Sequence, residues 1–235
     1  MKVLLFGSSG LIGRHCLTAL LNESRVEEVV APTRRNLSIK HHKLYNALVD
    51  FERLDEYPEL FDVDAIICCL GTTIKRAGSR ANFRRVDYQY CADAADLGRA
   101  HNVNSFLLVS AIGASESSPF FYSRIKGQLE SHLKQLMYAN LSIYRPSLLL
   151  GNREENRLGE SLGGKLMPLL DPLLFGPMSN YRAIPARWVA MALVNECLEL
   201  NDRTEQSPSV NVYGYDDIAR MAASTSISSQ TRQSK

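Results

Sequence analysis

The sequence predicts an α/β fold in which helices cover both faces of a parallel sheet. Short apolar runs alternate with longer helical patterns along the chain, as they do in repeated strand–helix–strand units. A glycine-rich turn follows the first apolar run, and two later runs lack the polar alternation of half-exposed strands. Strands that are buried in a parallel sheet account for all three observations.

Length and composition indicate one globular domain. The chain has 235 residues, of which 45% are hydrophobic and 22% charged, with a formal net charge of +2. Because typical domains have roughly 100 to 200 residues, we expect a single domain over residues 1–220. Glycine and proline loosen the pattern at 151–184, where we expect an irregular C-terminal lobe, and polar residues at 221–235 predict a flexible tail. The charge shows no basic excess for a nucleic-acid partner.

The sequence favours a cytoplasmic protein without a membrane span or a metal site. No stretch approaches the roughly 18 consecutive apolar residues of a membrane-spanning helix. The first apolar run leads into glycines, whereas a secretory signal would lead into a cleavage site. The five cysteines include no C-x-x-C pair, which is typical of reduced thiols, and the histidines lack metal-ligand spacing.

Strands and helices are expected at specific places. The apolar runs that predict strands are residues 3–6, 29–31, 47–49, 65–70, 106–110 and 141–144. Apolar residues at three-and-four spacing predict amphipathic helices over residues 11–21, 83–100, 122–138 and 186–200. The helix after the third strand is poorly marked.

The turn after the first strand has the spacing G-x-x-G-x-x-G. In such turns the first glycine permits a tight bend, the second lets the backbone approach a pyrophosphate, and the third lets the helix pack close to the strand. N–H groups at the helix start then face the phosphates. The turn therefore predicts a dinucleotide site on a Rossmann-type, doubly wound parallel sheet, with the C-terminal lobe on the substrate side. Its residues are Gly7, Ser8, Ser9, Gly10, Leu11, Ile12 and Gly13.

Arg34 and Arg35 lie at the end of the second strand, where NAD-selective proteins place an acidic residue about 20 residues beyond the glycines. Guanidinium groups can pair with a 2′-phosphate, and no carboxylate stands beside them to repel it. We therefore expect NADP(H), with NAD(H) less favoured. The alternative is that both arginines are solvated surface residues.

Two later strand ends complete the expected cofactor cleft, because ligands of such sheets lie outside the carboxyl ends of the strands. Asp50 and Phe51 follow the third strand and are expected to hold and cover the adenine. The fourth strand is followed by Leu70, Gly71 and Thr72, where the glycine would allow close passage of the ribose and phosphates.

Ser110, Tyr122 and Lys126 form a candidate catalytic group. Tyr122 and Lys126 are four residues apart at the start of a helical pattern, which places both side chains on one face. Ser110 ends an apolar strand. A tyrosine hydroxyl beside an ammonium group can give or take a proton, and a serine hydroxyl can polarise a substrate oxygen. Lys126 would also hold the nicotinamide ribose.

Together these motifs resemble the short-chain dehydrogenase/reductase superfamily of the atypical or extended type. Residues 31–35, 68–73, 120–127 and 145–151 resemble, more narrowly, the bacterial relatives of the human Tat-interacting oxidoreductase. One departure is that Arg85 stands near the place where many members have an Asn on the central helix. The resemblance implies NADP(H) contacts from Ser8, Ser9, Gly10, Leu11, Arg34, Arg35, Leu70, Tyr122, Lys126, Pro146, Leu149 and Arg157.

The leading functional hypothesis is an NADP(H)-dependent oxidoreductase that acts on a small carbonyl or alcohol. Two alternatives use the same residues or the same fold: a nucleotide-sugar epimerase, and an NADPH-sensing regulatory or protein-binding protein with little turnover. The sequence leaves open a homodimer and a protein partner. It also leaves the substrate open, because no cluster of charged residues after Gly151 indicates a ligand.

Overall fold

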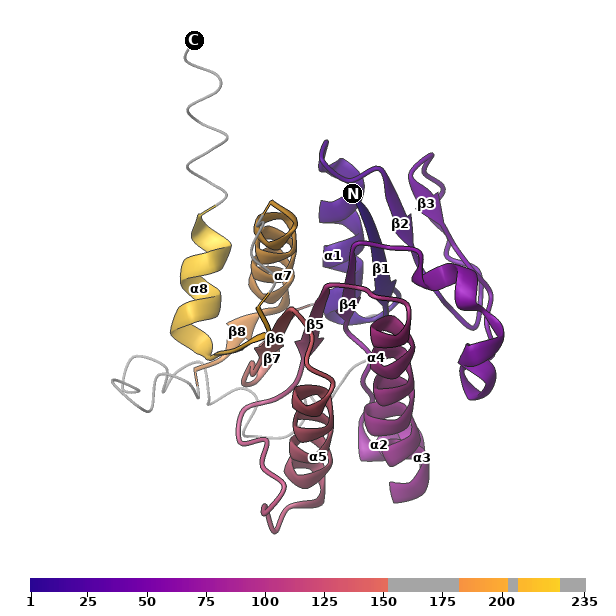
Figure 1. Cartoon of the computed structure of the whole chain (residues 1–235). Helices are drawn as coiled ribbons and strands as arrows, with labels where there is room; N and C mark the ends of the chain where they lie inside the picture. The colour runs from indigo at the N-terminus through magenta and orange to yellow at the C-terminus, as the bar shows by residue number, and fades with distance from the viewer. Residues whose placement is uncertain (152–181, 203–206, 225–235) are drawn as a thin grey trace.

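A seven-stranded parallel sheet forms the centre of the computed structural model, which describes residues 1–151, 182–202 and 207–224 (Figure 1). The strand order is β3-β2-β1-β4-β5-β6-β9, so the chain reverses its direction of progress between β1 and β4. This is the doubly wound Rossmann arrangement, and the predicted fold class is confirmed. The strands are β1 Lys2–Phe6, β2 Glu28–Val30, β3 Leu44–Tyr45, β4 Ala65–Cys68, β5 Ser105–Val109, β6 Asn140–Tyr144 and β9 Ser209–Tyr213.

Helices cover both faces of the sheet (Figure 1). On one face lie α1 Leu11–Asn22, α7 Ala186–Asn201 and α8 Tyr215–Ala223. The other face carries the 3-10 turns η1 Phe51–Glu56 and η2 Pro58–Phe61, then α4 Tyr90–Ala100 and α5 Phe121–Gln135. The short helices α2 Ile74–Ala77 and α3 Arg80–Arg84 precede the π-helical turn η3 Arg85–Gln89, which leads into α4. No helix in the described ranges is long and apolar enough to cross a membrane.

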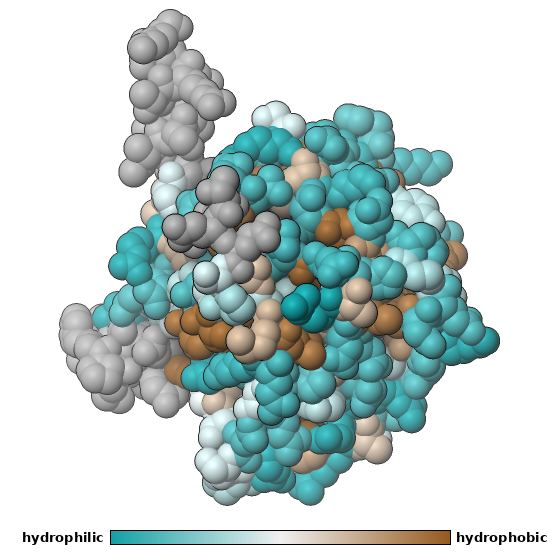
Figure 2. Space-filling view, in the orientation of Figure 1, coloured by the Kyte–Doolittle hydropathy of each residue, from teal (hydrophilic) through white to brown (hydrophobic). Residues whose placement is uncertain are grey.

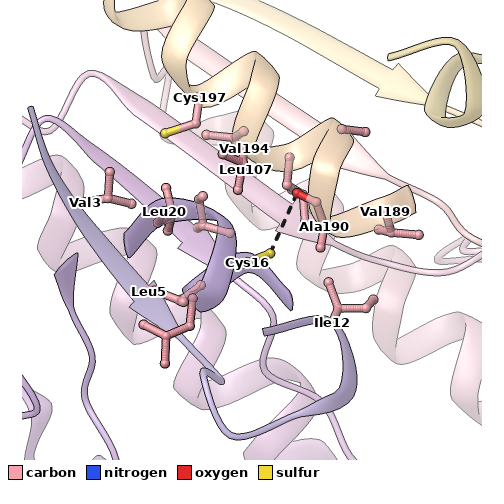
Figure 3. Packing of buried hydrophobic residues seen from close by; sticks show 14 of the residues in the cluster. Val3, Leu5, Ile12, Cys16, Leu20, Leu107, Val189, Ala190, Val194 and Cys197 are labelled. Atoms are coloured by element: carbon pink, nitrogen blue, oxygen red, sulfur yellow. Dashed lines mark hydrogen bonds between the residues drawn. The ribbon is translucent and has the colours of Figure 1, made fainter. Parts of the chain in front are cut away.

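A hydrophobic core lies on each face of the sheet. Successive residues of each central strand point alternately into one core and into the other. In β1, Val3 and Leu5 face α1 and α7, whereas Leu4 and Phe6 face the opposite layer. All four are fully buried, as expected of a strand covered on both faces. Figure 3 shows the core between the sheet and helices α1 and α7, where the Cys16 Sγ of α1 lies 4.0 Å from the Ala190 carbonyl oxygen of α7.

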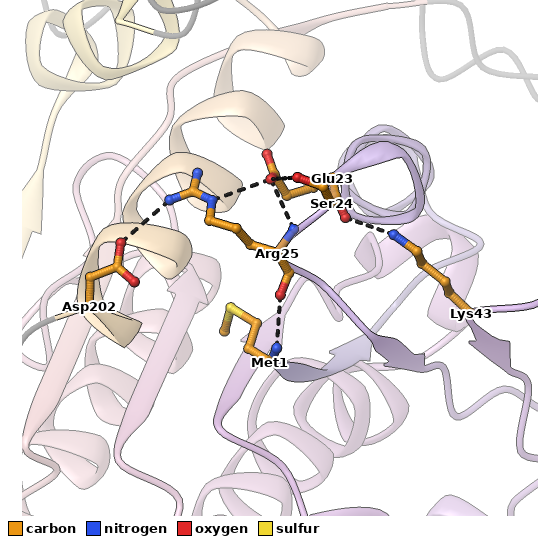
Figure 4. A network of polar contacts seen from close by, with 6 residues as sticks. All are labelled: Met1, Glu23, Ser24, Arg25, Lys43 and Asp202. Atoms are coloured by element: carbon orange, nitrogen blue, oxygen red, sulfur yellow. Dashed lines mark hydrogen bonds and ion pairs between the residues drawn. The ribbon is translucent and has the colours of Figure 1, made fainter.

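Arg25 joins the loop after α1 to the end of α7 (Figure 4). Its guanidinium pairs with Glu23 at 3.3 Å and with Asp202 at 3.5 Å. Lys43, just before β3, donates to the Glu23 carbonyl oxygen at 2.8 Å. These contacts lie at the amino-terminal edge of the sheet, opposite the edge where the ligand is expected.

Several predicted boundaries differ from the structure. The third strand is β3 at Leu44–Tyr45, although residues 47–49 still pair with the chain at Thr33. The predicted helix at 83–100 is interrupted by η3, where the backbone takes one wider turn. Helix α8 continues to Ala223, so the expected tail is helical at 221–223. Residues 225–235 and most of the lobe expected at 151–184 lie outside the described residues; β7 Leu149–Leu150 and β8 Ile184–Pro185 pair at its ends.

The last strand of the sheet, β9, was not predicted, and a buried carboxylate fixes it. Glu196 of α7 accepts hydrogen bonds from Ser142 at 2.7 Å, from Tyr144 at 2.5 Å and from Tyr213 at 2.6 Å. Tyr213 belongs to β9 and the other two donors to β6. Glu196 therefore ties the two strands at this edge to the helix above them.

We expect Glu196→Ala to lower the free energy of unfolding by about 3 kcal/mol, because buried hydroxyl groups would lose their acceptor. Urea denaturation would measure this. Glu199→Ala is the matched control, since Glu199 is exposed on the same helix, and should change stability by about 0.5 kcal/mol or less. Equal effects of the two substitutions would contradict the assigned role of Glu196.

Candidate functional site

The glycine turn lies between β1 and α1 and has no room for a side chain at Gly7 or at Gly13. Gly7 has a φ of +77°, and a Cβ placed on it would lie 2.6 Å from the Cys69 carbonyl carbon. A Cβ on Gly13 would lie 2.1 Å from the Gly7 carbonyl oxygen. The close approach leaves the first N–H groups of α1 at the carboxyl edge of the sheet, where a helix start favours a phosphate.

Ser8, Ser9 and Leu11 lie in the same turn and differ in their surroundings. The Ser8 hydroxyl is fully buried and has no hydrogen-bond partner among the described residues. Ser9, by contrast, is exposed. A Cβ on Gly151 would lie 3.0 Å from Leu11 Cδ1, so the chain after β7 passes beside the turn. The segment after β6 therefore reaches the candidate cofactor cleft.

Pro146 and Leu149 lie on that segment. The Pro146 carbonyl oxygen accepts from Ile112 N–H at 3.0 Å, which joins the chain after β6 to the chain after β5. Leu149 is the first residue of β7 and packs against the core around α1. Arg157 lies outside the described residues.

Arg34 and Asp50 leave the sheet side by side. Val49 N–H donates to the Thr33 carbonyl oxygen at 3.0 Å. Arg34 follows Thr33 and Asp50 follows Val49, so the two residues lie on neighbouring segments. Arg34 and Arg35 are both exposed. The Asp50 carboxylate accepts from Glu52 N–H at 3.0 Å and begins the turn η1.

Phe51 lies in the hydrophobic core, whereas the sequence predicted that its ring would cover the adenine. Only 6% of Phe51 is exposed. Its ring centroid lies 6.3 Å from that of Phe6 and 5.4 Å from that of Tyr90. The ring therefore belongs to the core, and Asp50 is the exposed member of this pair.

A buried ion pair lies where the loop after β4 meets α5. Lys126 Nζ lies 2.9 Å from Asp87 Oδ1, and the two side chains are 3% and 1% exposed. The other oxygen of Asp87 accepts from Thr72 N–H at 2.7 Å. A Cβ on Gly71 would lie 3.3 Å from Asp87 Oδ1 and 3.9 Å from Lys126 Nζ, so the loop passes close to both charged groups at this glycine. The pair thus joins η3, α5 and the expected ribose-binding loop.

The ammonium of Lys126 stays charged in this setting. Burial, the largest single effect, lowers its pKa, but the charge of Asp87 and then that of Tyr122 raise the pKa above its ordinary value overall. Because the folded pKa exceeds the unfolded one, the pair contributes stability throughout neutral pH. That contribution is lost only as the pH rises toward the folded pKa.

Tyr122 lies one turn before Lys126, near the start of α5. It is 39% exposed, and its ring centroid lies 5.6 Å from that of the buried Phe83. The helix approaches the preceding loop closely at Gly127, where a Cβ would lie 2.2 Å from the Ser115 carbonyl carbon. The tyrosine is therefore held on one side by packing, with part of its surface open to solvent.

Ser110 follows β5, and its hydroxyl is committed to Glu130. The Ser110 Oγ donates to Glu130 Oε1 at 2.6 Å, and Ser110 is only 5% exposed. Arg145 Nε donates to the same oxygen at 3.0 Å, and its Nη2 lies 2.5 Å from Glu130 Oε2. Hydrogen bonds to Glu130 raise the pKa of Arg145 above its ordinary value. Glu130 thereby orients Ser110 with its oxygen lone pairs free to accept.

Apolar side chains are exposed around this edge of the sheet. Phe120 precedes α5, and Leu148 and Leu150 follow β6; all three are exposed. Figure 2 shows hydrophobic side chains gathered near the middle of one face, beside β7 and β8, on an otherwise mostly hydrophilic surface. Within the described ranges, no group of histidines, cysteines and acidic residues could hold a metal ion.

Sequence reasoning missed Asp87, Glu130 and Arg145. Asp87 and Glu130 are acidic residues at positions that the helical pattern buries, and this mismatch was the available signal. Arg85, which stands near the expected Asn, instead extends to Glu52 at 3.3 Å. The contact to Lys126 comes from Asp87, two residues further along the chain.

We expect Asp87→Asn to lower the free energy of unfolding by about 3 kcal/mol, because it leaves the Lys126 ammonium buried without a counter-charge. The double variant Asp87→Asn/Lys126→Met should recover part of that loss. Asp96→Asn is the control, since Asp96 pairs with His132 on the exposed side of α4. Denaturant unfolding of the unaltered protein, Asp87→Asn, Lys126→Met and the double variant gives the coupling, and additive effects would show that the two side chains do not depend on each other.

The chain matches the protein family described as NAD(P)H-binding over residues 7–144. Protein HTATIP2 of Rattus norvegicus is 36% identical over 198 residues, which span 83% of this chain and 80% of that protein. Protein FMP52-1, mitochondrial, of Scheffersomyces stipitis is 34% identical over 162 residues, or 67% of this chain and 71% of that protein.

Solved structures share the fold at low identity. MoeE5 in complex with UDP-glucose and NAD has a TM-score of 0.67 at 16% identity, and the match covers 96% of this chain and 82% of that one. The oxidoreductase ylbE from Lactococcus lactis has a TM-score of 0.65 at 16% identity and covers 95% and 96%. Fold, glycine turn and sequence similarity agree: the chain belongs to the NAD(P)H-binding Rossmann family.

Proposed function

We propose that this protein is an NADP(H)-dependent oxidoreductase of the short-chain dehydrogenase/reductase type, acting on a small carbonyl or alcohol. The observation that carries the proposal is the placement of Tyr122 one helical turn from Lys126, whose ammonium is fixed by Asp87 at 2.9 Å beside Gly71. This pair lies at the carboxyl edge of the sheet, as the glycine turn does.

The residues at this edge suit a dinucleotide. The start of α1 offers N–H groups to a pyrophosphate, and Gly71 brings the loop after β4 close to Lys126, the residue assigned to a ribose. We assign the nicotinamide ribose to Lys126 and the adenosine to the neighbourhood of Arg34 and Asp50. A bound nicotinamide dinucleotide supplies or accepts a hydride.

Tyr122 is the proposed proton donor or acceptor. Tyr122 is partly exposed and lies on the helix that carries Lys126, so we assign its hydroxyl group to the substrate oxygen. Ser110 donates a hydrogen bond to Glu130 at 2.6 Å, so its oxygen is left to act as a hydrogen-bond acceptor toward a substrate hydroxyl. Tyr122 is thus the hydroxyl that donates when a carbonyl is reduced, and Ser110 accepts from the alcohol that forms.

The cofactor preference is proposed to be NADP(H). Arg34 and Arg35 are exposed after β2, and no acidic side chain follows β2 at that point. The epimerase alternative has less support, because the solved epimerase structures are similar at 14% to 18% identity and share the fold alone. The proposed partner is a small-molecule substrate.

We propose a cytoplasmic location on the basis of the five cysteines, which are all free thiols. Several fungal relatives are named as mitochondrial proteins. Both compartments keep thiols reduced, so the argument from cysteine chemistry favours a reducing compartment in general.

Calorimetric titration should show that NADPH binds at least about tenfold more tightly than NADH, a difference of about 1.4 kcal/mol. Arg34→Ala should remove most of that difference by weakening NADPH binding selectively. Equal affinities for the two cofactors in the unaltered protein would refute the preference for NADP(H).

Tyr122→Phe should abolish turnover of small aldehydes and ketones, followed by the absorbance of NADPH, while the affinity for NADPH changes by less than about tenfold. Tyr45→Phe is the control, because Tyr45 is an exposed tyrosine on β3. Turnover by Tyr122→Phe at the rate of the unaltered protein would rule out the proposed proton transfer.

A further inference from the structure

A cluster of charged and aromatic side chains lies beside the adenosine end of the candidate cleft. Glu52 Oε1 accepts from the Tyr90 hydroxyl at 2.5 Å and lies 3.3 Å from Arg85 Nε. Glu52 belongs to η1, Arg85 to η3 and Tyr90 to α4. One segment that follows β3 and two consecutive segments that follow β4 therefore meet at one carboxylate.

The cluster lies next to Arg34. Thr33 pairs with Leu48 in the parallel register, so Arg34 and the chain at Asp50 leave the sheet together. The Asp50 carboxylate then holds the N–H of Glu52 at 3.0 Å. Arg34 follows β2 and Arg85 belongs to η3 after β4, and the chain from Asp50 to Glu52 connects their two positions.

The pKa of Tyr90 reports on the same neighbourhood. Burial, followed by the hydrogen bond and charge of Glu52, raises this pKa to about 12. The charges of Arg85 and Arg34 oppose that rise. The two guanidinium charges therefore act in the same direction on one hydroxyl group.

The contact between Arg85 and Glu52 is easily exchanged. The two side chains are 53% and 52% exposed, and ion pairs of that kind contribute about 0 to 1 kcal/mol to stability. A phosphate offers a guanidinium more charge and more acceptor oxygens than a carboxylate does. Arg85 can thus leave Glu52 for a phosphate with little loss of stability.

We propose that Arg85 is a further cation for the 2′-phosphate of NADP(H), in addition to Arg34 and Arg35, and that Glu52 competes with the phosphate for it. The inference rests on the proposed function and extends it. Arg85 becomes a specificity-determining residue, and Glu52 lowers the affinity for the phosphate by its own negative charge.

The test uses two fragments of the cofactor, adenosine 2′,5′-bisphosphate and adenosine 5′-monophosphate, in calorimetric titrations of the full chain. Arg85→Gln should weaken binding of the bisphosphate by about fivefold or more and change binding of the monophosphate by less than about twofold. Arg84→Gln is the matched control, because Arg84 is the adjacent exposed arginine and donates to Gln128 of α5 at 2.7 Å. It should change neither affinity.

Glu52→Gln should change the affinity for the bisphosphate in the opposite direction. It keeps an oxygen that can accept from Tyr90 but removes the charge, so the bisphosphate should bind about threefold more tightly and the monophosphate with unchanged affinity. A structural role for Glu52 would not raise affinity. Thermal denaturation of each variant would confirm that all of them are folded.

The outcomes separate this inference from the proposed function. If the unaltered protein distinguishes the two fragments and Arg85→Gln distinguishes them equally well, Arg85 does not bind the phosphate and the inference is overturned alone. Equal weakening of both fragments by Arg85→Gln also overturns it, since Arg85 would then support the adenosine in general. If the unaltered protein binds neither fragment, the proposed cofactor site fails as well.

Discussion

The arrangement of the candidate cleft depends on the buried ion pair between Asp87 and Lys126. Opposite charges that are 1% and 3% exposed are stable only at close range, so the pair fixes α5 against η3. The second oxygen of Asp87 holds Thr72 and thereby fixes the loop after β4 as well. Tyr122 lies one turn away on α5, so the same pair sets the position of the proposed proton donor.

The other walls of the cleft follow the same logic of close contacts at the carboxyl edge of the sheet. The missing side chains of Gly7 and Gly13 let α1 start within contact of β1 and β4. Glu130 links Ser110 to Arg145 and so joins the ends of β5 and β6. Each neighbouring pair of central strands is therefore tied together at the edge where a dinucleotide would lie.

The sequence was sufficient to predict what depends on local pattern. Apolar runs located the central strands, and the glycine spacing located the turn, because both signals lie within a few residues. Asp87 and Glu130 escaped prediction because their partners, Lys126 and Arg145, lie 39 and 15 residues away. The edge strand β9 was missed because its residues are only alternately half-buried and exposed, and Phe51 was assigned to adenine because its packing against Phe6 depends on tertiary contacts.

Membership of the NAD(P)H-binding family and the geometry at this edge lead to one central claim, that a dinucleotide lies across the carboxyl ends of β1 and β4. A crystal structure of the protein with NADP⁺ tests it most directly. The claim predicts the pyrophosphate at the start of α1, the nicotinamide ribose within hydrogen-bond distance of Lys126 and the 2′-phosphate beside Arg34. Density for the cofactor elsewhere, or a Lys126 ammonium that contacts Asp87 alone in the complex, would contradict the claim.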